Sequence, residues 1–273
     1  MKALKNHTIL YDAECPMCSM YTKKFITNGM LEETGRASYQ NIPENVCPMV
    51  DRQRAANEIA LVNNETGEVS YGISSLFKVI ANSFPVFKPL FLFKPFIFLM
   101  TKIYAFIAYN RRVIIPSKSK MDFEIQPTFR LDYRIAYLTF TWFVTAFILS
   151  AYAHLLIGVL PAGNNYREYL ICGGQIVFQG IIVTILSANK RWDYLGNMMT
   201  ISFAGALILL IPLFISIIFD IPPVLSALYF MAVAGLMFLE HIRRTKLLDL
   251  GWVLTITWVI YRMIVLLLIL KFN

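Results

Sequence analysis

The sequence predicts a chain of two classes: an α/β domain at the N-terminus, followed by an all-α bundle of about five transmembrane helices. Two observations predict this division. Of the 273 residues, 57% are hydrophobic and 15% are charged, whereas a soluble domain is about 45–50% apolar and about 25% charged. Residues 1–134 nevertheless carry 17 of the 25 lysines and arginines. We therefore expect a dithiol domain at 1–83, an interfacial amphipathic segment and linker at 84–134, and a transmembrane helical bundle at 135–273.

The N-terminal domain is expected to begin with a short buried strand at Thr8–Tyr11, followed by a helix from Cys15 to about Thr27. The helix opens on the motif Cys15-Pro-Met-Cys18. Because Cys15 lies near the N-cap and Pro16 at the first helical position, unpaired backbone N–H groups and the helix dipole favour a Cys15 thiolate. Cys15 is therefore the expected nucleophile. Cys18, expected to be more buried, would resolve the mixed disulfide.

Asp12 lies three residues before Cys15. Its carboxylate is expected either to move a proton to or from Cys18 or to hydrogen-bond the loop, and the sequence does not decide between these roles. The predicted catalytic residues are thus Cys15, Cys18 and Asp12. No cofactor and no metal-binding residue is predicted.

The remaining elements of this domain follow in the order of a minimal thioredoxin-like domain, β-α-β and then β-β-α. The strand before a Cys-x-x-Cys at a helix start belongs to the same arrangement. The expected elements are a strand at Arg36–Asn41, a hairpin of Glu58–Val62 and Glu68–Tyr71 around Gly67, and a helix at Ser74–Asn82 capped by Ser74 or Ser75.

At this point the motif Tyr11-Asp12-x-x-Cys15-x-x-Cys18 resembles the signature of the DCC family of thiol–disulfide oxidoreductases. The stretch from Gly67 to Gly72 and the pattern Tyr104-x-x-x-Ala108-x-Asn110-Arg111 agree with it. The resemblance covers about residues 7–112. It implies a thioredoxin-like fold, with redox roles for the two cysteines and Asp12 as the motif acid. One departure is that Ala55-Ala56-Asn57 stands where thioredoxins have a cis-proline before the third strand.

In the second half of the chain, five stretches are long and apolar enough to span a bilayer as helices of about 20 residues. They lie at Ile135–Leu160, Tyr169–Ser187, Met198–Phe219, Pro222–Leu239 and Trp252–Leu270. Nine basic residues lie in segments on the side of the N-terminal domain, and two, Arg167 and Lys271, on the other. This excess predicts an integral protein of the cell (inner) membrane, with the N-terminal domain in the cytoplasm and the C-terminus outside.

Residues 84–109 are also apolar and aromatic, but three prolines and three lysines interrupt them. We expect this segment to lie in the interface, with its lysines facing lipid phosphates. Within the spans, His154, Gln175, Gln179 and Arg262 indicate either a polar track for a substrate, quinone or proton, or hydrogen bonds between helices.

The favoured function is a membrane-tethered thiol–disulfide oxidoreductase whose substrate is a protein disulfide or a small-thiol disulfide. Three alternatives remain. Cys15 and Cys18 could bind metal with His7 and Cys47, they could be an inert structural pair, or the bundle could transport solutes or handle lipids, with the N-terminal domain as a redox sensor or metal-binding module. Nucleic acid is not an expected partner, because cations beside apolar spans account for the net charge of +8. The sequence predicts no oligomeric state.

Overall fold

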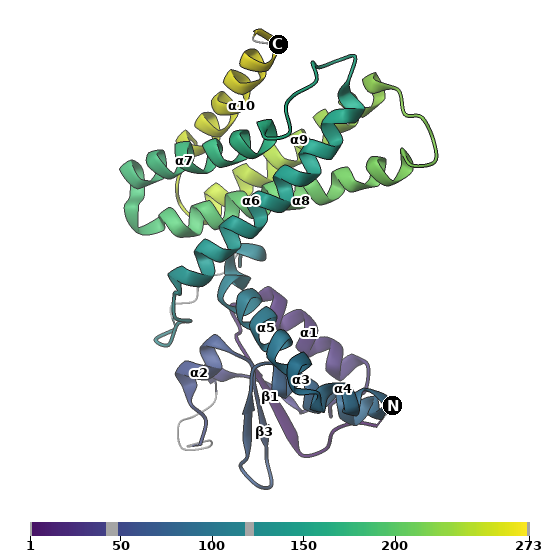
Figure 1. Ribbon diagram of the computed structural model, residues 1–273. Coiled ribbons are helices and arrows are strands. Elements are labelled where there is room, and N and C mark those ends of the chain that lie inside the picture. The colour runs from purple at the N-terminus through teal and green to yellow at the C-terminus, as the bar shows by residue number, and fades with distance from the viewer. Residues whose placement is uncertain (1, 42–48, 118–122, 272–273) are drawn as a thin grey trace. The chain divides into compact units, whose positions relative to one another are not determined.

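A computed structural model of the chain describes residues 2–41, 49–117 and 123–271 (Figure 1). These residues belong to two compact units, Met1–Tyr133 and Arg134–Asn273. The first unit contains the cysteine motif, and the second contains the apolar helices.

The N-terminal unit is built on a mixed sheet of four strands in the order β2-β1-β3-β4. β1 pairs in parallel with β2 and antiparallel with β3, and β3 pairs antiparallel with β4. The strands are β1 (His7–Tyr11), β2 (Arg36–Ser38), β3 (Ala60–Asn63) and β4 (Val69–Tyr71). The sequence-based strand at Arg36–Asn41 is confirmed only for its first half, because Tyr39–Asn41 forms the 3-10 turn η1.

Helices cover both faces of this sheet, because alternate strand residues point to opposite sides. Ile9 and Leu61 belong to one buried cluster, and Leu10 and Val62 belong to another on the opposite face. The first face packs on α1 (Pro16–Thr27), α3 (Ile73–Ser83) and α5 (Lys94–Ile114), and the second on α2 (Arg52–Asn57) (Figure 1).

The start of α3 differs from the sequence-based prediction. The residue before the helix is Gly72, whose φ of 62° is unfavourable for other residues, and no side chain caps the helix. The hydroxyl of Ser75 instead donates to the carbonyl of Ser70 at 2.7 Å. The prediction that Ser74 or Ser75 caps this helix is therefore wrong.

The segment after α3 forms two helices that meet at a sharp bend. The 3-10 turn η2 (Pro85–Phe87) leads into α4 (Lys88–Leu92), and α5 starts two residues later. Pro85–Leu92 and Lys94–Ile114 are bent by 90° and reach the length and hydropathy of a membrane span only together.

The second unit consists of long helices. They are α6 (Leu131–Ala153), which begins at the end of the first unit, α7 (Arg167–Ser187), α8 (Arg191–Ile215), α9 (Pro223–Leu247) and α10 (Val253–Lys271). Short 3-10 turns follow α6 and α7, namely η3 (His154–Leu156) and η4 (Ala188–Lys190). The length and hydropathy of these helices are compatible with a membrane protein.

The predicted fold class, a thioredoxin-like domain followed by about five transmembrane helices, is wrong. The structure is 70% helical, and its small mixed sheet does not clearly form a thioredoxin-like domain. Among the described residues, four stretches pass as membrane spans: Leu131–Leu156, Arg167–Ile215, Pro223–Leu247 and Val253–Lys271. Two expected spans fall in the 49-residue stretch Arg167–Ile215, because only η4 interrupts its helical backbone. Within that stretch, α7 and α8 pack side by side (Figure 1).

Candidate functional site

The cysteine motif lies in the turn between β1 and α1, where the local sequence determines the helix start. Cys15 is the N-cap residue, with extended backbone angles, and Pro16 occupies the first helical position. The sulfur of Cys15 accepts a hydrogen bond from the backbone N–H of Cys18 at 3.2 Å. The predicted helix start is thus confirmed, and an unpaired N–H of the first turn does point at the Cys15 sulfur.

Both cysteines of the motif are free thiols and both are buried. Cys15 is 1% exposed and Cys18 is 6% exposed. These two small exposed fractions do not decide which thiol group is the more buried, so the expectation that it is Cys18 stays a prediction.

The surroundings of the two thiols shift their pKa values in opposite directions. A hydrogen bond from the Cys18 side chain, assisted by the positive charge of Arg111, lowers the pKa of Cys15 to about 7 despite its burial. The same hydrogen bond and burial raise the pKa of Cys18 well above its ordinary value. At neutral pH, Cys15 is thus partly a thiolate and Cys18 is a thiol, the distribution that a nucleophile and a resolving thiol require.

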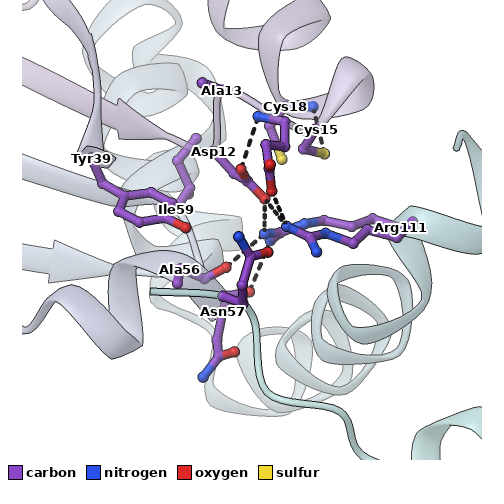
Figure 2. Close-up of polar contacts among 12 residues, drawn as sticks. Asp12, Ala13, Cys15, Cys18, Tyr39, Ala56, Asn57, Ile59 and Arg111 are labelled. Carbon is purple, nitrogen blue, oxygen red and sulfur yellow. Dashed lines mark hydrogen bonds and ion pairs between the residues drawn. The ribbon is translucent and has the colours of Figure 1, made fainter. Parts of the chain in front are cut away.

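Asp12 is buried beside the motif, and both of its carboxylate oxygens are engaged (Figure 2). One oxygen accepts from the backbone N–H of Glu14 at 3.0 Å and from the side-chain amide of Gln40 at 2.8 Å. The other lies 2.7 Å from the guanidinium of Arg111. The interpretation that Asp12 hydrogen-bonds the loop is therefore confirmed, while a proton transfer with Cys18 stays a prediction.

Arg111 is the residue of this site that sequence reasoning missed. It extends from α5 into the turn before α1, and its guanidinium donates to the carbonyls of Asn57 and Ala56 at 3.0 and 2.6 Å (Figure 2). Both carbonyls belong to the segment before β3, where the sequence lacks the proline of thioredoxins. Arg111 is the last residue of the pattern that begins at Tyr104, but nothing in the sequence indicated that it pairs with Asp12.

Two further side chains of α5 hold the same loops. The hydroxyl of Tyr104 accepts a hydrogen bond from the backbone N–H of Ile59 at 2.9 Å. The guanidinium of Arg112 lies 2.9 Å from the carboxylate of Glu14. The end of α5 is therefore tied to both segments that surround the dithiol.

The alternative metal site finds no support in the described residues. His7 begins β1, and Cys15 follows the other end of that strand, where Tyr11 lies roughly 13 Å from His7. No group of three histidine, cysteine or acidic side chains could hold a metal ion in the part of the chain that the structure describes. Cys47, the fourth proposed ligand, lies outside the described residues.

The two glutamines of α7 form hydrogen bonds with neighbouring helices. Gln179 of α7 accepts from the hydroxyl of Tyr194 at 2.8 Å and donates to Thr257 at 3.2 Å. Gln175 donates to the carbonyl of Trp258 at 3.4 Å. For both glutamines, interhelical hydrogen bonding is therefore confirmed. The guanidinium of Arg262 lies 4.2 Å from the centre of the Trp258 ring.

Comparison with known proteins gives this chain no relative: no family model, no curated protein and no solved structure matches it.

Proposed function

We propose that this membrane protein is a thiol–disulfide oxidoreductase, with Cys15 as the nucleophile and Cys18 as the resolving thiol. One observation carries the proposal: two free thiols share the first turn of α1, and their surroundings favour the thiolate of Cys15 and the thiol of Cys18. The motif resemblance to the DCC family points to the same chemistry.

The proposed reaction is a two-step exchange with a protein disulfide or a small-thiol disulfide. The Cys15 thiolate attacks one substrate sulfur, forms a mixed disulfide and releases the other sulfur as a thiolate. Cys18 then loses its proton and attacks the Cys15 sulfur, which releases the second substrate thiol and leaves a Cys15–Cys18 disulfide. The substrate gains two electrons and the dithiol loses two. A second thiol donor would restore the dithiol, and the same steps in reverse would oxidise a substrate dithiol.

We infer that the dithiol faces the cytoplasm of the cell (inner) membrane and that α6, α7, α8, α9 and α10 each cross once, which leaves the C-terminus outside. The excess of basic residues in the segments on the N-terminal side supports this orientation. A disulfide in that compartment is transient, because cytosolic thiols keep proteins reduced. A topology reporter fused to residue 1 tests the orientation.

We also infer that the bent pair of α4 and α5 lies in the membrane interface. Leu92, next to the bend, is 77% exposed, and Phe93 and Phe98 are exposed as well. Lys88, Lys94 and Lys102 are exposed on the same two helices. Apolar and aromatic side chains beside lysines fit the boundary between acyl chains and anionic headgroups.

Direct exchange with a disulfide tests the proposed function. The reduced full chain in lipid nanodiscs is mixed with oxidised glutathione, and mass spectrometry follows the Cys15–Cys18 disulfide and the thiols released. One intramolecular disulfide should form for every two glutathione molecules released. Equal release from Cys15→Ser and wild type would contradict the proposal.

A further inference from the structure

Arg111 carries a buried positive charge beside the dithiol, and acceptors from two separate segments fix its position. Asp12, in the turn after β1, accepts from one end nitrogen of the guanidinium, as does the carbonyl of Ala56. The carbonyl of Asn57 accepts from the other end nitrogen. A guanidinium is a rigid planar fork, so three acceptors in fixed positions also fix the direction of its remaining N–H groups.

One donor of this guanidinium is not used. The Nε of Arg111 is buried, and no acceptor for it exists among the residues that the structure describes. A buried donor without a partner is unfavourable, and a nearby anion reduces that cost. Asp12, which holds the guanidinium, also accepts a hydrogen bond from the backbone N–H of Cys15 through its own carbonyl at 3.1 Å, and both cysteines act electrostatically on Arg111.

We propose that Arg111 is a positioning residue that, together with the hydrogen bond from Cys18, favours the thiolate of Cys15, and that Asp12 acts by holding Arg111 in place rather than by carrying a proton. This inference rests on the proposed function, because it names what activates the nucleophile of that site. Asp12 and the carbonyls of Ala56 and Asn57 set the guanidinium beside the dithiol. The negative charge that Cys15 gains on ionisation is then matched by a cation already in place.

The charged and titratable groups around Cys15 come from three elements. Cys18 and Tyr21 lie on α1, Asp12 in the preceding turn, and Arg111 on α5. Arg111 lowers the pKa of Cys15, and Asp12 raises it by a smaller amount. Removing both charges should therefore still disfavour the thiolate.

The test measures the ionisation of Cys15 in the full chain in lipid nanodiscs. Cys47→Ser and Cys172→Ser leave the two site cysteines as the remaining thiols. Iodoacetamide is added at pH values from 5 to 10, and mass spectrometry of the peptide that contains the motif gives the alkylation rate of Cys15. The pH at half-maximal rate reports the pKa of the thiol, and thermal unfolding shows which variants are folded.

Arg111→Met should raise this midpoint by about one pH unit or more, because an opposite charge nearby shifts a pKa by about one to three units. At pH 7, a rise of about one unit lowers the alkylation rate roughly five-fold. Arg111→Lys keeps the positive charge but not the planar guanidinium. Its midpoint should lie between those of the wild type and Arg111→Met. If Arg111→Met does not fold, the double variant Asp12→Asn/Arg111→Met leaves no unpaired buried charge, and its midpoint should also exceed that of the wild type.

The matched control is Arg36→Met. Arg36 also donates hydrogen bonds to α1, through Thr22 and Ser19, but it is not among the main causes of the shifted pKa of either thiol. Its loss should leave the midpoint unchanged. The proposal is overturned by a wild-type midpoint in a folded variant that lacks Arg111, or by an equal shift in Arg36→Met. Because no disulfide substrate is used, these outcomes are independent of whether the protein exchanges disulfides.

Discussion

The guanidinium of Arg111 lies 2.7 Å from the carboxylate of Asp12, although 99 residues separate the two in the sequence and both side chains are buried. This ion pair joins the end of α5 to the turn that carries the cysteines. Because the same guanidinium also binds the segment before β3, the position of α5 is part of the dithiol site.

The first prediction concerns the stability of this ion pair. Asp12→Asn and Arg111→Met should each reduce the free energy of unfolding of the N-terminal unit by about 3–5 kcal/mol, because each leaves a buried charge unpaired. The double variant should lose less than the sum, with a coupling energy of about 0.5–3 kcal/mol. Denaturant unfolding of the full chain, followed by near-UV circular dichroism, measures the four values.

The exposed pair of Lys78 and Glu68, at 2.6 Å, is the control for that cycle. Its coupling energy should be about 0.2–1 kcal/mol, as for other surface ion pairs. If the losses of unfolding free energy in Asp12→Asn and Arg111→Met add up in the double variant, the coupling energy is zero. The ion pair would then make no contribution of its own to stability.

The second prediction is a pH dependence. The absorbance of the Cys15 thiolate near 240 nm should rise with pH and reach half its final value at about pH 7, while Cys18 stays protonated at that pH. Because the folded pKa of Cys15 lies below the unfolded value, ionised Cys15 stabilises the fold above the unfolded pKa. That contribution is lost as the pH falls through about 7. A midpoint at or above that of a free thiol, about 8.5, would refute the prediction.

The third prediction places α4 and α5 in the membrane interface. A nitroxide label at Phe93 in nanodiscs should lie about 5–10 Å below the headgroup boundary by power-saturation EPR. The exposed residue Met263, in the middle of α10, should give a deep value, and Met20, exposed on α1, should give an aqueous one. A depth for Phe93 near the bilayer centre, about 15 Å, would mean that the bent pair enters the core instead.

The fourth prediction concerns the polar cluster of the apolar helices. Tyr194 donates to Gln179 at 2.8 Å, and its hydroxyl lies 3.2 Å from the ring of His241. Tyr194→Phe should lower the free energy of unfolding in bicelles by about 0.6–1.7 kcal/mol, the range for hydrogen bonds between membrane helices. Tyr229→Phe, which loses one longer exposed contact of 3.3 Å, is the matched control and should change it less. If both variants lose the same unfolding free energy, the hydrogen bonds of Tyr194 stabilise the bundle no more than the exposed contact of Tyr229.

Local features of the redox site could be predicted from sequence because they depend on neighbouring residues. The Cys15 N-cap and Pro16 require only the first turn of a helix, and the structure confirms both. The Asp12–Arg111 pair could not be predicted, because helical periodicity gives the face of α5 but not the acceptor that a side chain on that face will meet.

The prediction of the fold class failed for a different reason. Alternating residues indicated strands close to β1, β3 and β4, but alternation does not determine how much helix surrounds a short sheet. Hydropathy located the apolar helices, but the short Ala188–Lys190 turn between α7 and α8 leaves both helices within one of the four stretches that pass as membrane spans. Both errors concern how elements combine rather than which residues form them.

The most direct test of the central claim is to trap the mixed disulfide. In the full chain with Cys47→Ser and Cys172→Ser, Cys18→Ser removes the resolving thiol, so a disulfide substrate attacked by Cys15 should remain attached. Oxidised glutathione should yield one adduct on Cys15 that dithiothreitol releases, and none in Cys15→Ser. Absence of the adduct in Cys18→Ser, or an equal amount in Cys15→Ser, would contradict the claim that Cys15 is the nucleophile of a redox dithiol.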